Sequence, residues 1–230
     1  MTIRIYRTLE QGSAEWFQAR CGLLTASEMK LIVTEKTLKI ASNDKERAHL
    51  YELLAQRISG YVEPSYVGDN MLRGWEDEET ARQLYSEHYA LVEQVGFVTN
   101  DKWGFTLGAS PDGLVGKDGG IECKSRIQKY QIQTVIEHLT QGTIPSEYAL
   151  QVQTSMMVTE RPWWDFISYS GGLPMLVIRC HPIPEVVAAI EEASAAFNER
   201  IETKLATYRE ALENARTIPT ERREEEEIIV

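Results

Sequence analysis

Cysteine is scarce in this chain, and its three cysteines stand far apart, at positions 21, 123 and 180. No two of them have the C-x-x-C spacing that structural zinc sites and redox motifs use. The four histidines are also scattered, and they match no metal-binding or general-base motif. These absences argue against a disulfide framework, structural zinc or an iron–sulfur cluster, and they are typical of a cytosolic protein with reduced thiols.

The sequence also has no long apolar run and no segment with the character of a signal peptide. We therefore expect neither secretion nor a membrane span. Basic residues are in the minority, since 24 Lys and Arg stand against 35 Asp and Glu, for a net charge of −11. Taken by itself, this balance slightly favours a small-molecule enzyme over a nucleic-acid-binding protein.

The length and the apolar content are those of one globular domain. A chain of 230 residues with 43% hydrophobic content can bury a substantial core. We assign residues 1–216 to a single domain. Residues 217–230 mix blocks of like charge with a short apolar end, and we expect a disordered acidic tail there.

The most informative motif is a Pro-Asp pair ending at Asp112, followed ten residues later by Glu122-Cys123-Lys124. Residues 118–120, Asp-Gly-Gly, lie between the two halves and predict the turn of a hairpin. Residues two apart on a strand share a face, so Glu122 and Lys124 project together while Cys123 points into the core. The hairpin therefore brings Asp112, Glu122 and Lys124 to one place.

Two carboxylates and a lysine form a set that suits phosphate chemistry. Oxygen ligands favour magnesium or manganese over zinc, so Asp112 and Glu122 are candidate metal ligands. A bound cation can polarise a phosphate, and Lys124 can orient the attacking water or neutralise the transition state. The alternative is an ordinary charged surface hairpin, because four residue types at a permitted spacing also occur by chance.

Longer segments carry a more specific signal than the E-C-K triplet. They are residues 19–28 (ARCGLLTASE), Gly74 with Glu78, residues 110–114 (SPDGL), the triplet itself and residues 148–156 (YALQVQTSM). With these segments, over about residues 13 to 180, the chain resembles the lambda-exonuclease family of phage nucleases, within the YqaJ-like viral recombinase group of the PD-(D/E)xK nucleases. The stretch between residues 33 and 70 and the C-terminal tail show no resemblance that can be placed.

The resemblance implies an α/β fold with a mixed central sheet flanked by helices, the restriction-endonuclease-like core of the PD-(D/E)xK enzymes. It implies a Mg²⁺-dependent exodeoxyribonuclease, in which Mn²⁺ can substitute, that acts on ends of linear double-stranded DNA. Such an enzyme degrades one strand 5′→3′ to mononucleotides and leaves a 3′ single-stranded overhang. That overhang feeds phage-type recombination by a single-strand annealing protein. The resemblance further implies a homotrimeric ring in the cytoplasm of a bacterial host.

The resemblance also assigns roles to individual residues. The two motif carboxylates and the backbone carbonyl of Cys123 would bind the metal, and Lys124 would act on the water or the transition state. Glu78 would add a carboxylate, and Gln151 would contact the active site from a helix opposite the hairpin. Both residues have an ordinary alternative, since Glu78 stands in an acidic run and Gln151 belongs to a polar helix face.

A second site is predicted for a terminal 5′-phosphate. Arg20 can meet phosphate oxygens in a bidentate fork, and residues 25–28, Thr-Ala-Ser-Glu, form a capping box that predicts a helix start. A helix N-terminus offers free N–H groups and a positive dipole end. In the resembled family the positions that match Arg20, Ser27 and Ser110 hold the terminal phosphate. The alternative is that Thr25 only caps a helix and Arg20 makes a surface ion pair.

Apolar spacing and turn residues predict the elements around these motifs. Helices are expected at 43–59, 76–89, 146–158 and 184–215, after a short helix that ends near Gly22. Strands are expected at 95–99, 105–109, 163–169 and 175–180, in addition to the hairpin. Ser13 and Ser146 are candidate N-caps, and Gly60 is a candidate helix stop.

Two other classes of function stay open. A structure-specific or endonucleolytic DNA repair nuclease would use the same core, and a comparison of linear with nicked or circular DNA separates it from an exonuclease. A non-catalytic DNA-binding subunit of the same fold is disfavoured because Asp112, Glu122 and Lys124 are all intact.

Overall fold

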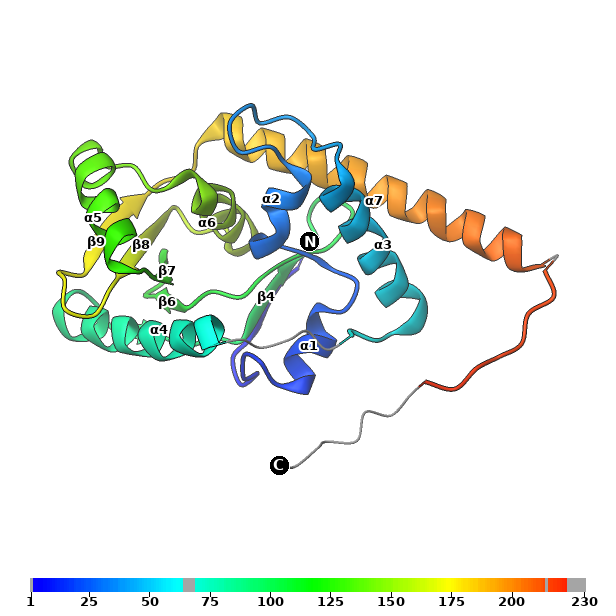
Figure 1. Ribbon diagram of the computed structural model, residues 1–230, viewed down its shortest axis with the longest axis horizontal. Helices are drawn as coiled ribbons and strands as arrows, with labels where there is room; N and C mark the ends of the chain where they lie inside the picture. Colours follow the sequence, from blue (N-terminus) through cyan, green and yellow to red (C-terminus); the bar gives the residue numbers. More distant parts are fainter. Residues whose placement is uncertain (1, 64–68, 214, 223–230) are drawn as a thin grey trace.

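The computed structural model, shown in Figure 1, describes residues 2–63, 69–213 and 215–222. It is a mixed α/β fold with helices around two sheets, which confirms the predicted class. The strands are β1 (Ile3–Tyr6), β2 (Leu24–Thr25), β3 (Val92–Glu93), β4 (Phe97–Asn100), β5 (Leu107–Ala109), β6 (Gly113–Val115), β7 (Gly119–Ser125), β8 (Trp163–Tyr169) and β9 (Leu176–Cys180). The α-helices are α1 (Ala14–Arg20), α2 (Met29–Ile32), α3 (Asp44–Ser59), α4 (Asp69–His88), α5 (Gln128–Glu137), α6 (Ser146–Thr159) and α7 (Pro184–Glu213).

The strands form two sheets rather than one. The first has the order β1-β4-β5-β2, and the second has the order β3-β6-β7-β8-β9. The chain passes from the first to the second at residues 110–112, which belong to neither sheet. Pro111 in this stretch has no N–H group to donate to a ladder, so pairing is interrupted there. Asp112 therefore stands at the junction between the two sheets.

The predicted hairpin is present as β6 and β7, which pair antiparallel with Leu114 opposite Gly120. Its turn lies at residues 116–118 and not at the predicted 118–120, because Gly119 and Gly120 already pair within the strands and Gly116 takes the positive φ of 52°. On its other edge β7 pairs in parallel with β8, so β7 is an inner strand of its sheet. Cys123 is fully buried in a cluster with Ile121 and Ile167, as its position on the strand predicts. The opposite face of β7 carries Glu122 and Lys124.

Helix α6 connects the two halves of the fold. It contacts β4 and β5 of the first sheet and β8 of the second, with α2 and α7 also against it. Most of α6 is buried, including Leu150, Val152 and Met156 in the main hydrophobic cluster. Helix α4 covers the second sheet through Ala81 and Tyr85. Figure 1 also shows α7 extending well past the rest of the molecule.

The predicted helices are all found, with differences at their ends. Ser13 caps α1 by accepting a hydrogen bond from the Trp16 N–H, and Gly60 ends α3 at a φ of 64°. Helix α4 begins at Asp69, earlier than predicted. The N-cap assignment of Ser146 is wrong. Ser146 is the first helical residue of α6, because Pro145 holds the N-cap position one residue earlier, with φ −54° and ψ 134°.

The C-terminal tail is only partly described. Residues 217–222 form neither helix nor strand, and residues 223–230 of the predicted tail lie outside the described residues. The domain boundary at residue 216 stays a prediction. No helix in the described ranges has the length and apolar character needed to cross a membrane.

The packing of Gly120 against Trp164 leads to a test of the hairpin's placement. A Cβ at Gly120 would overlap the Trp164 ring, and that ring is fully buried and has no room to move. We expect Gly120→Ala to lower the free energy of unfolding by about 1–3 kcal/mol, as overpacking does. Gly171→Ala is the control, because a Cβ there meets nothing within 4 Å. Urea denaturation of both variants measures the effect, and equal stabilities would contradict this packing.

Candidate active site

The two strands of the hairpin place the three motif residues at one point. Asp112 Oδ2 accepts a hydrogen bond of 2.5 Å from the backbone N–H of Cys123. Lys124 Nζ lies 2.6 Å from Glu122 Oε1. Asp112 is 8% exposed and Glu122 is 1% exposed, so both carboxylates are withdrawn from water.

The two oxygens of the Glu122 carboxylate differ in their hydrogen bonding. Its Oε1 atom accepts a hydrogen bond of 2.5 Å from Gln151 Nε2 on α6, in addition to the contact with Lys124. Its Oε2 atom is buried and has no hydrogen-bond partner among the described residues. A buried carboxylate oxygen without a partner is costly. Such an oxygen suits a cation.

Glu78 belongs to the same electrostatic cluster, from α4. Burial and then repulsion from Asp112 raise the pKa of Glu78 to about 8. Burial likewise raises the pKa of Glu122 to about 7, although Lys124 opposes the rise. The pKa of Asp112 is also raised by burial, against the attraction of Lys124.

Lys124 responds in the opposite sense. Burial by itself would lower the pKa of Lys124, but attraction to Glu122 and Asp112 outweighs burial and raises the pKa. The ammonium group therefore stays charged at neutral pH. One lysine faces three carboxylates, so the cluster carries an excess of negative charge that a low-dielectric site disfavours.

These features fit a hard divalent cation. In the part of the chain that the structure describes, no three His, Cys, Asp or Glu side chains are arranged to hold a metal by themselves. The predicted ligand set does not require this, because it combines the carboxylates of Asp112 and Glu122 with the backbone carbonyl of Cys123. All three are hard oxygen donors of the kind that Mg²⁺ prefers. The unpartnered Oε2 of Glu122 and the mutual repulsion of the carboxylates favour a cation there.

Two contacts that the sequence reasoning missed fix α4 against the hairpin. Asp77 Oδ2 accepts a hydrogen bond of 2.5 Å from Ser125 Oγ at the end of β7. Arg82 Nη1 donates a hydrogen bond of 2.8 Å to the backbone carbonyl of Asp112. Arg82 stands four residues after Glu78, so helical spacing was a usable signal for it. These contacts hold the helix that carries Glu78.

A second cluster of polar groups surrounds Arg20 at the end of α1. Arg20 Nη1 lies 3.0 Å from Ser110 Oγ, and Nη2 lies 3.0 Å from Thr25 Oγ1 and 3.5 Å from Ser27 Oγ. Burial lowers the pKa of Arg20, with Glu28 partly opposing this. An arginine stays charged in any case. The cluster is therefore a partly buried cation whose side-chain hydrogen bonds go to hydroxyl oxygens, which suits phosphate recognition.

Trp16 completes this cluster and was also missed. Its ring centroid lies 4.3 Å from the Arg20 guanidinium carbon, and its Nε1 donates to Ser110 Oγ at 3.1 Å. The Trp16 side chain therefore helps to position both the Arg20 guanidinium and the Ser110 hydroxyl. The helical spacing of four residues between Trp16 and Arg20 was the only sequence signal for this contact.

The predicted capping box at residues 25–28 is wrong. Thr25 makes no side-chain hydrogen bond to a helix N–H, and it is followed by the three-residue turn η1 (Ala26–Glu28) before the short helix α2. The Thr25 hydroxyl is engaged elsewhere, since it accepts from Arg20 and donates to Glu28 Oε2 at 2.7 Å. A phosphate site here thus depends on side chains and not on the N-terminus of a long helix.

The raised pKa of Glu78 predicts how stability depends on pH without metal. Its pKa is about 8, against an ordinary value of 4.5. A raised acid pKa means that stability is fully present below about pH 4.5 and is lost as the pH rises through about 8. In EDTA, we expect Glu78→Gln to raise the free energy of unfolding by roughly 1 kcal/mol at pH 9, and by much less at pH 5.

The neighbouring residue is a matched control for this measurement. Hydrogen bonds from Arg82 and Gln83 lower the pKa of Glu79, so its charge is favoured. We expect Glu79→Gln to give no stabilisation at pH 9. Urea denaturation at both pH values compares the two variants. The same pH profile for both would show that Glu78 is not in a repulsive cluster.

Comparison with known proteins agrees with this geometry. Residues 15–162 match the YqaJ-like viral recombinase domain. The chain is similar to the crystal structure of an alkaline exonuclease from Laribacter hongkongensis, with 32% identity and a TM-score of 0.75, over 88% of this chain and 100% of that one. The complex of that exonuclease with dAMP gives 33% identity, the same TM-score and the same coverage. No protein with a curated description matches the chain.

A more distant structure shows the fold alone. A phage-related exonuclease from Haemophilus somnus 129PT has 13% identity and a TM-score of 0.58, over 81% of this chain and 96% of that one. The domain match spans both polar clusters, from Arg20 to Gln151. The similarity to the alkaline exonuclease covers the whole of that protein. The chain therefore belongs to the YqaJ-like viral recombinase family, and it has the alkaline exonuclease fold with a core of the PD-(D/E)xK type.

Proposed function

We propose that the chain is a metal-dependent exodeoxyribonuclease that degrades one strand of linear double-stranded DNA 5′→3′ to mononucleotides and leaves a 3′ overhang. One observation carries this proposal. The carboxylate cluster around Glu122 and the arginine–hydroxyl cluster around Arg20 are joined by the three-residue stretch from Ser110 to Asp112. A site for the scissile phosphate thus lies close to a site for a terminal phosphate. The similarity to an exonuclease of known structure supports this reading.

Asp112, Glu122 and the carbonyl of Cys123 would hold Mg²⁺, for which Mn²⁺ can substitute. When bound, the ion supplies positive charge that polarises the scissile phosphate. Gln151 fixes the orientation of the Glu122 carboxylate through its hydrogen bond to Oε1. Glu78 adds a third carboxylate on the α4 side.

Lys124 has the role of an electrostatic stabiliser. Its ammonium group is held charged by Glu122 and Asp112. A fixed positive charge in a buried site stabilises negative charge that develops on the phosphate in the transition state. Lys124 also forms an ion pair with Glu122. If the ammonium group moved away, the buried carboxylate of Glu122 would lose its counter-ion.

The Arg20 cluster would hold the 5′-terminal phosphate. Arg20 offers two N–H groups on one side, and Thr25, Ser27 and Ser110 offer hydroxyls around it. Each cleavage creates a new 5′-phosphate, which is drawn into the same cluster. The duplex then advances by one nucleotide, and 5′→3′ direction follows from this advance.

Three further parts of the proposal come from the family resemblance. They are a homotrimeric ring around the DNA, a single-strand annealing protein as partner, and a location in the cytoplasm of a bacterial host. The acidic net charge of −11 is compatible with a ring that needs basic groups only along its bore. Sedimentation of the purified chain at micromolar concentration distinguishes a trimer from a monomer.

The assignment of Lys124 predicts a loss of turnover. We expect Lys124→Ala to slow digestion of linear duplex roughly a hundredfold or more, because one transition-state stabiliser is removed. Lys102→Ala, at a surface ion pair with Glu160, is the control and should digest normally. The assay compares linear with nicked circular duplex, in Mg²⁺ and in EDTA. Digestion by Lys124→Ala at the wild-type rate, or by wild type in EDTA, would overturn the assignment.

The assignment of Arg20 predicts a loss of end preference. Wild type should digest 5′-phosphorylated ends faster than 5′-hydroxyl ends, and Arg20→Ala should digest both at the same slow rate. Arg4→Ala removes an exposed arginine and should keep the preference. Initial rates on matched duplexes that differ only at the 5′ end give the answer. An undiminished preference in Arg20→Ala would show that the terminal phosphate binds elsewhere.

A further inference from the structure

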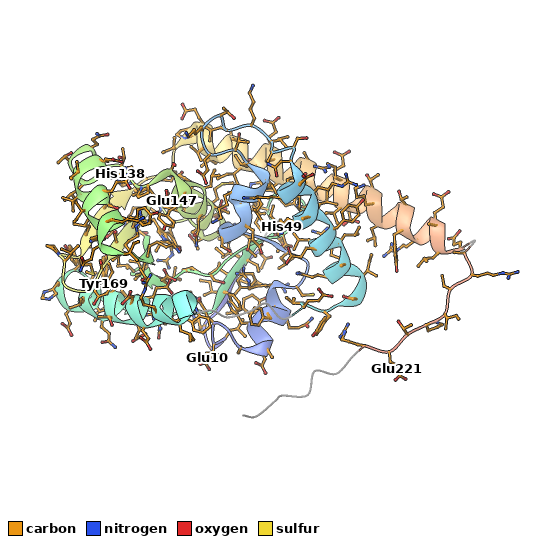
Figure 2. The ribbon with its side chains drawn as sticks, in the orientation of Figure 1. Glu10, His49, His138, Glu147, Tyr169 and Glu221 are labelled. Atoms are coloured by element: carbon orange, nitrogen blue, oxygen red, sulfur yellow. The ribbon has the colours of Figure 1, made fainter. Side chains whose placement is uncertain are left out.

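A cavity of about 980 Å³ lies beside the active site and has no role in the proposal above. It is lined by the end of β7, one face of α5 along its whole length, residues 143–145, the start of α6 and Arg73 of α4. Its lining includes Arg126 and Tyr148 but none of the motif carboxylates and no residue of the Arg20 cluster. Figure 2 shows two lining residues, His138 and Glu147, on the α5–α6 side of the molecule, far from Glu10 next to α1.

Arg126 is the notable group in this cavity. It is only 8% exposed, which is rare for arginine. Its backbone N–H donates to the carbonyl of Tyr169 at 2.7 Å, so the residue is fixed to the end of β8. Its Nη1 donates to Tyr148 Oη at 2.5 Å and to Glu147 Oε1 at 3.1 Å, whereas its buried Nε has no partner among the described residues. This guanidinium is positioned but only partly satisfied.

Aromatic rings stand next to this cation. The guanidinium carbon of Arg126 is 5.2 Å from the ring centroid of Tyr130 and 5.2 Å from that of Tyr148. Tyr130 is 43% exposed, and Lys129 Nζ lies 4.6 Å from its ring centroid, so a second cation stands where a base would stack. A fixed cation for a backbone phosphate beside an exposed ring for a base is the combination that binds single nucleic acid strands. Tyr148 also lies 5.6 Å from Lys124 Nζ, which connects the cavity to the active site.

A series of contacts runs from the Arg20 cluster through the carboxylates to the cavity, so the carboxylates stand between the two. Arg20 contacts Ser110, two residues before Asp112, and Asp112 in turn bonds the backbone of β7. Arg126 follows Lys124 by two residues on the same stretch. If the terminal phosphate lies at Arg20 and the scissile phosphate at the carboxylates, the strand beyond the scissile phosphate continues toward Arg126.

We propose that this cavity binds the digested strand on the 3′ side of the scissile phosphate. Arg126 contacts a backbone phosphate, and Tyr130 stacks on a base. The proposal rests on the exonuclease function proposed above and adds a second place where the enzyme holds its substrate. Glu147 is half-exposed and paired with Arg126, so it competes with the phosphate for the guanidinium.

Neutral phosphates test this contact directly. Duplexes carry a single methylphosphonate at one of the first five phosphates beyond the scissile bond, and affinity is measured with Ca²⁺ in place of Mg²⁺. In wild type, one position should lower affinity about tenfold, as expected for a charge-assisted hydrogen bond. In Arg126→Met the same substitution should have no effect. Arg209→Met, which removes an exposed arginine on α7, should retain the wild-type penalty.

Two further variants keep the test decisive if Arg126→Met does not fold. Tyr130→Ala should weaken binding about tenfold while Tyr130→Phe should not, because stacking needs the ring and not the hydroxyl. Glu147→Gln should strengthen binding a few-fold, since it removes the competing carboxylate. Wild-type binding by Tyr130→Ala, or weaker binding by Glu147→Gln, would overturn the proposal.

The outcomes also separate this proposal from the proposed function. If wild type digests linear duplex but no methylphosphonate position lowers its affinity, only the cavity proposal fails. If a methylphosphonate lowers the affinity of Arg126→Met as much as that of wild type, again only the cavity proposal fails. If wild type does not digest linear duplex in Mg²⁺ at all, the exonuclease function itself fails.

Discussion

The Glu122 carboxylate is 1% exposed and lies in a cluster with two other acidic side chains. An isolated ion at such a depth would cost several kcal/mol, so its surroundings must compensate for the lost water. Lys124 and Gln151 do this for one oxygen, and the second oxygen has no partner in the described structure. One residue of β7 and one residue of α6 thus hold the same carboxylate.

Helix α4 must hold a third carboxylate against the repulsion of the first two. Hydrogen bonds on both sides of Glu78 oppose that repulsion. On one side Asp77 is bonded to β7, and two turns after Glu78 the Tyr85 hydroxyl donates to Asp165 Oδ2 at 2.6 Å. Because the helix is fixed at both points, the carboxyl group of Glu78 stays in the cluster, and the cost of charging it there appears as a raised pKa.

Asp165 is itself part of a fixed group on β8 and β9. Arg179 contacts both of its carboxylate oxygens at 2.8 Å and stacks on the ring of Trp163 at 3.7 Å. The neighbouring Trp164 and Trp163 also fill the space left by the glycines of β7. Strands β8 and β9 therefore support β7, which carries Glu122 and Lys124, through these contacts.

How much could be predicted depended on the range of the interactions. The hairpin with Asp112, Glu122 and Lys124 followed from a turn signal and the two-residue period of a strand, which are local features. Gln151 was assigned by family resemblance alone, because its hydrogen bond to Glu122 joins two segments that are far apart in the sequence and leaves no local pattern. The Thr25 cap failed for a local reason, since the hydroxyl accepts from Arg20, five residues earlier, and donates to the Glu28 side chain instead of accepting from a helix N–H. The division into two sheets was also missed, although Pro111 marks the place.

The excess of acidic residues acquires a meaning if the chain is the proposed exonuclease. Its substrate is a polyanion, and the chain itself carries a net charge of −11, so its overall charge gives an internal stretch of duplex little attraction. A strand end is different, because it can reach the partly buried Arg20 cluster, and the carboxylates can share a divalent cation with its next phosphate. Binding is then favourable only where a terminus enters the site. On this argument the negative charge of the chain selects DNA ends over duplex interiors, and the partly buried Arg20 and Lys124 determine where along the strand the cut is made.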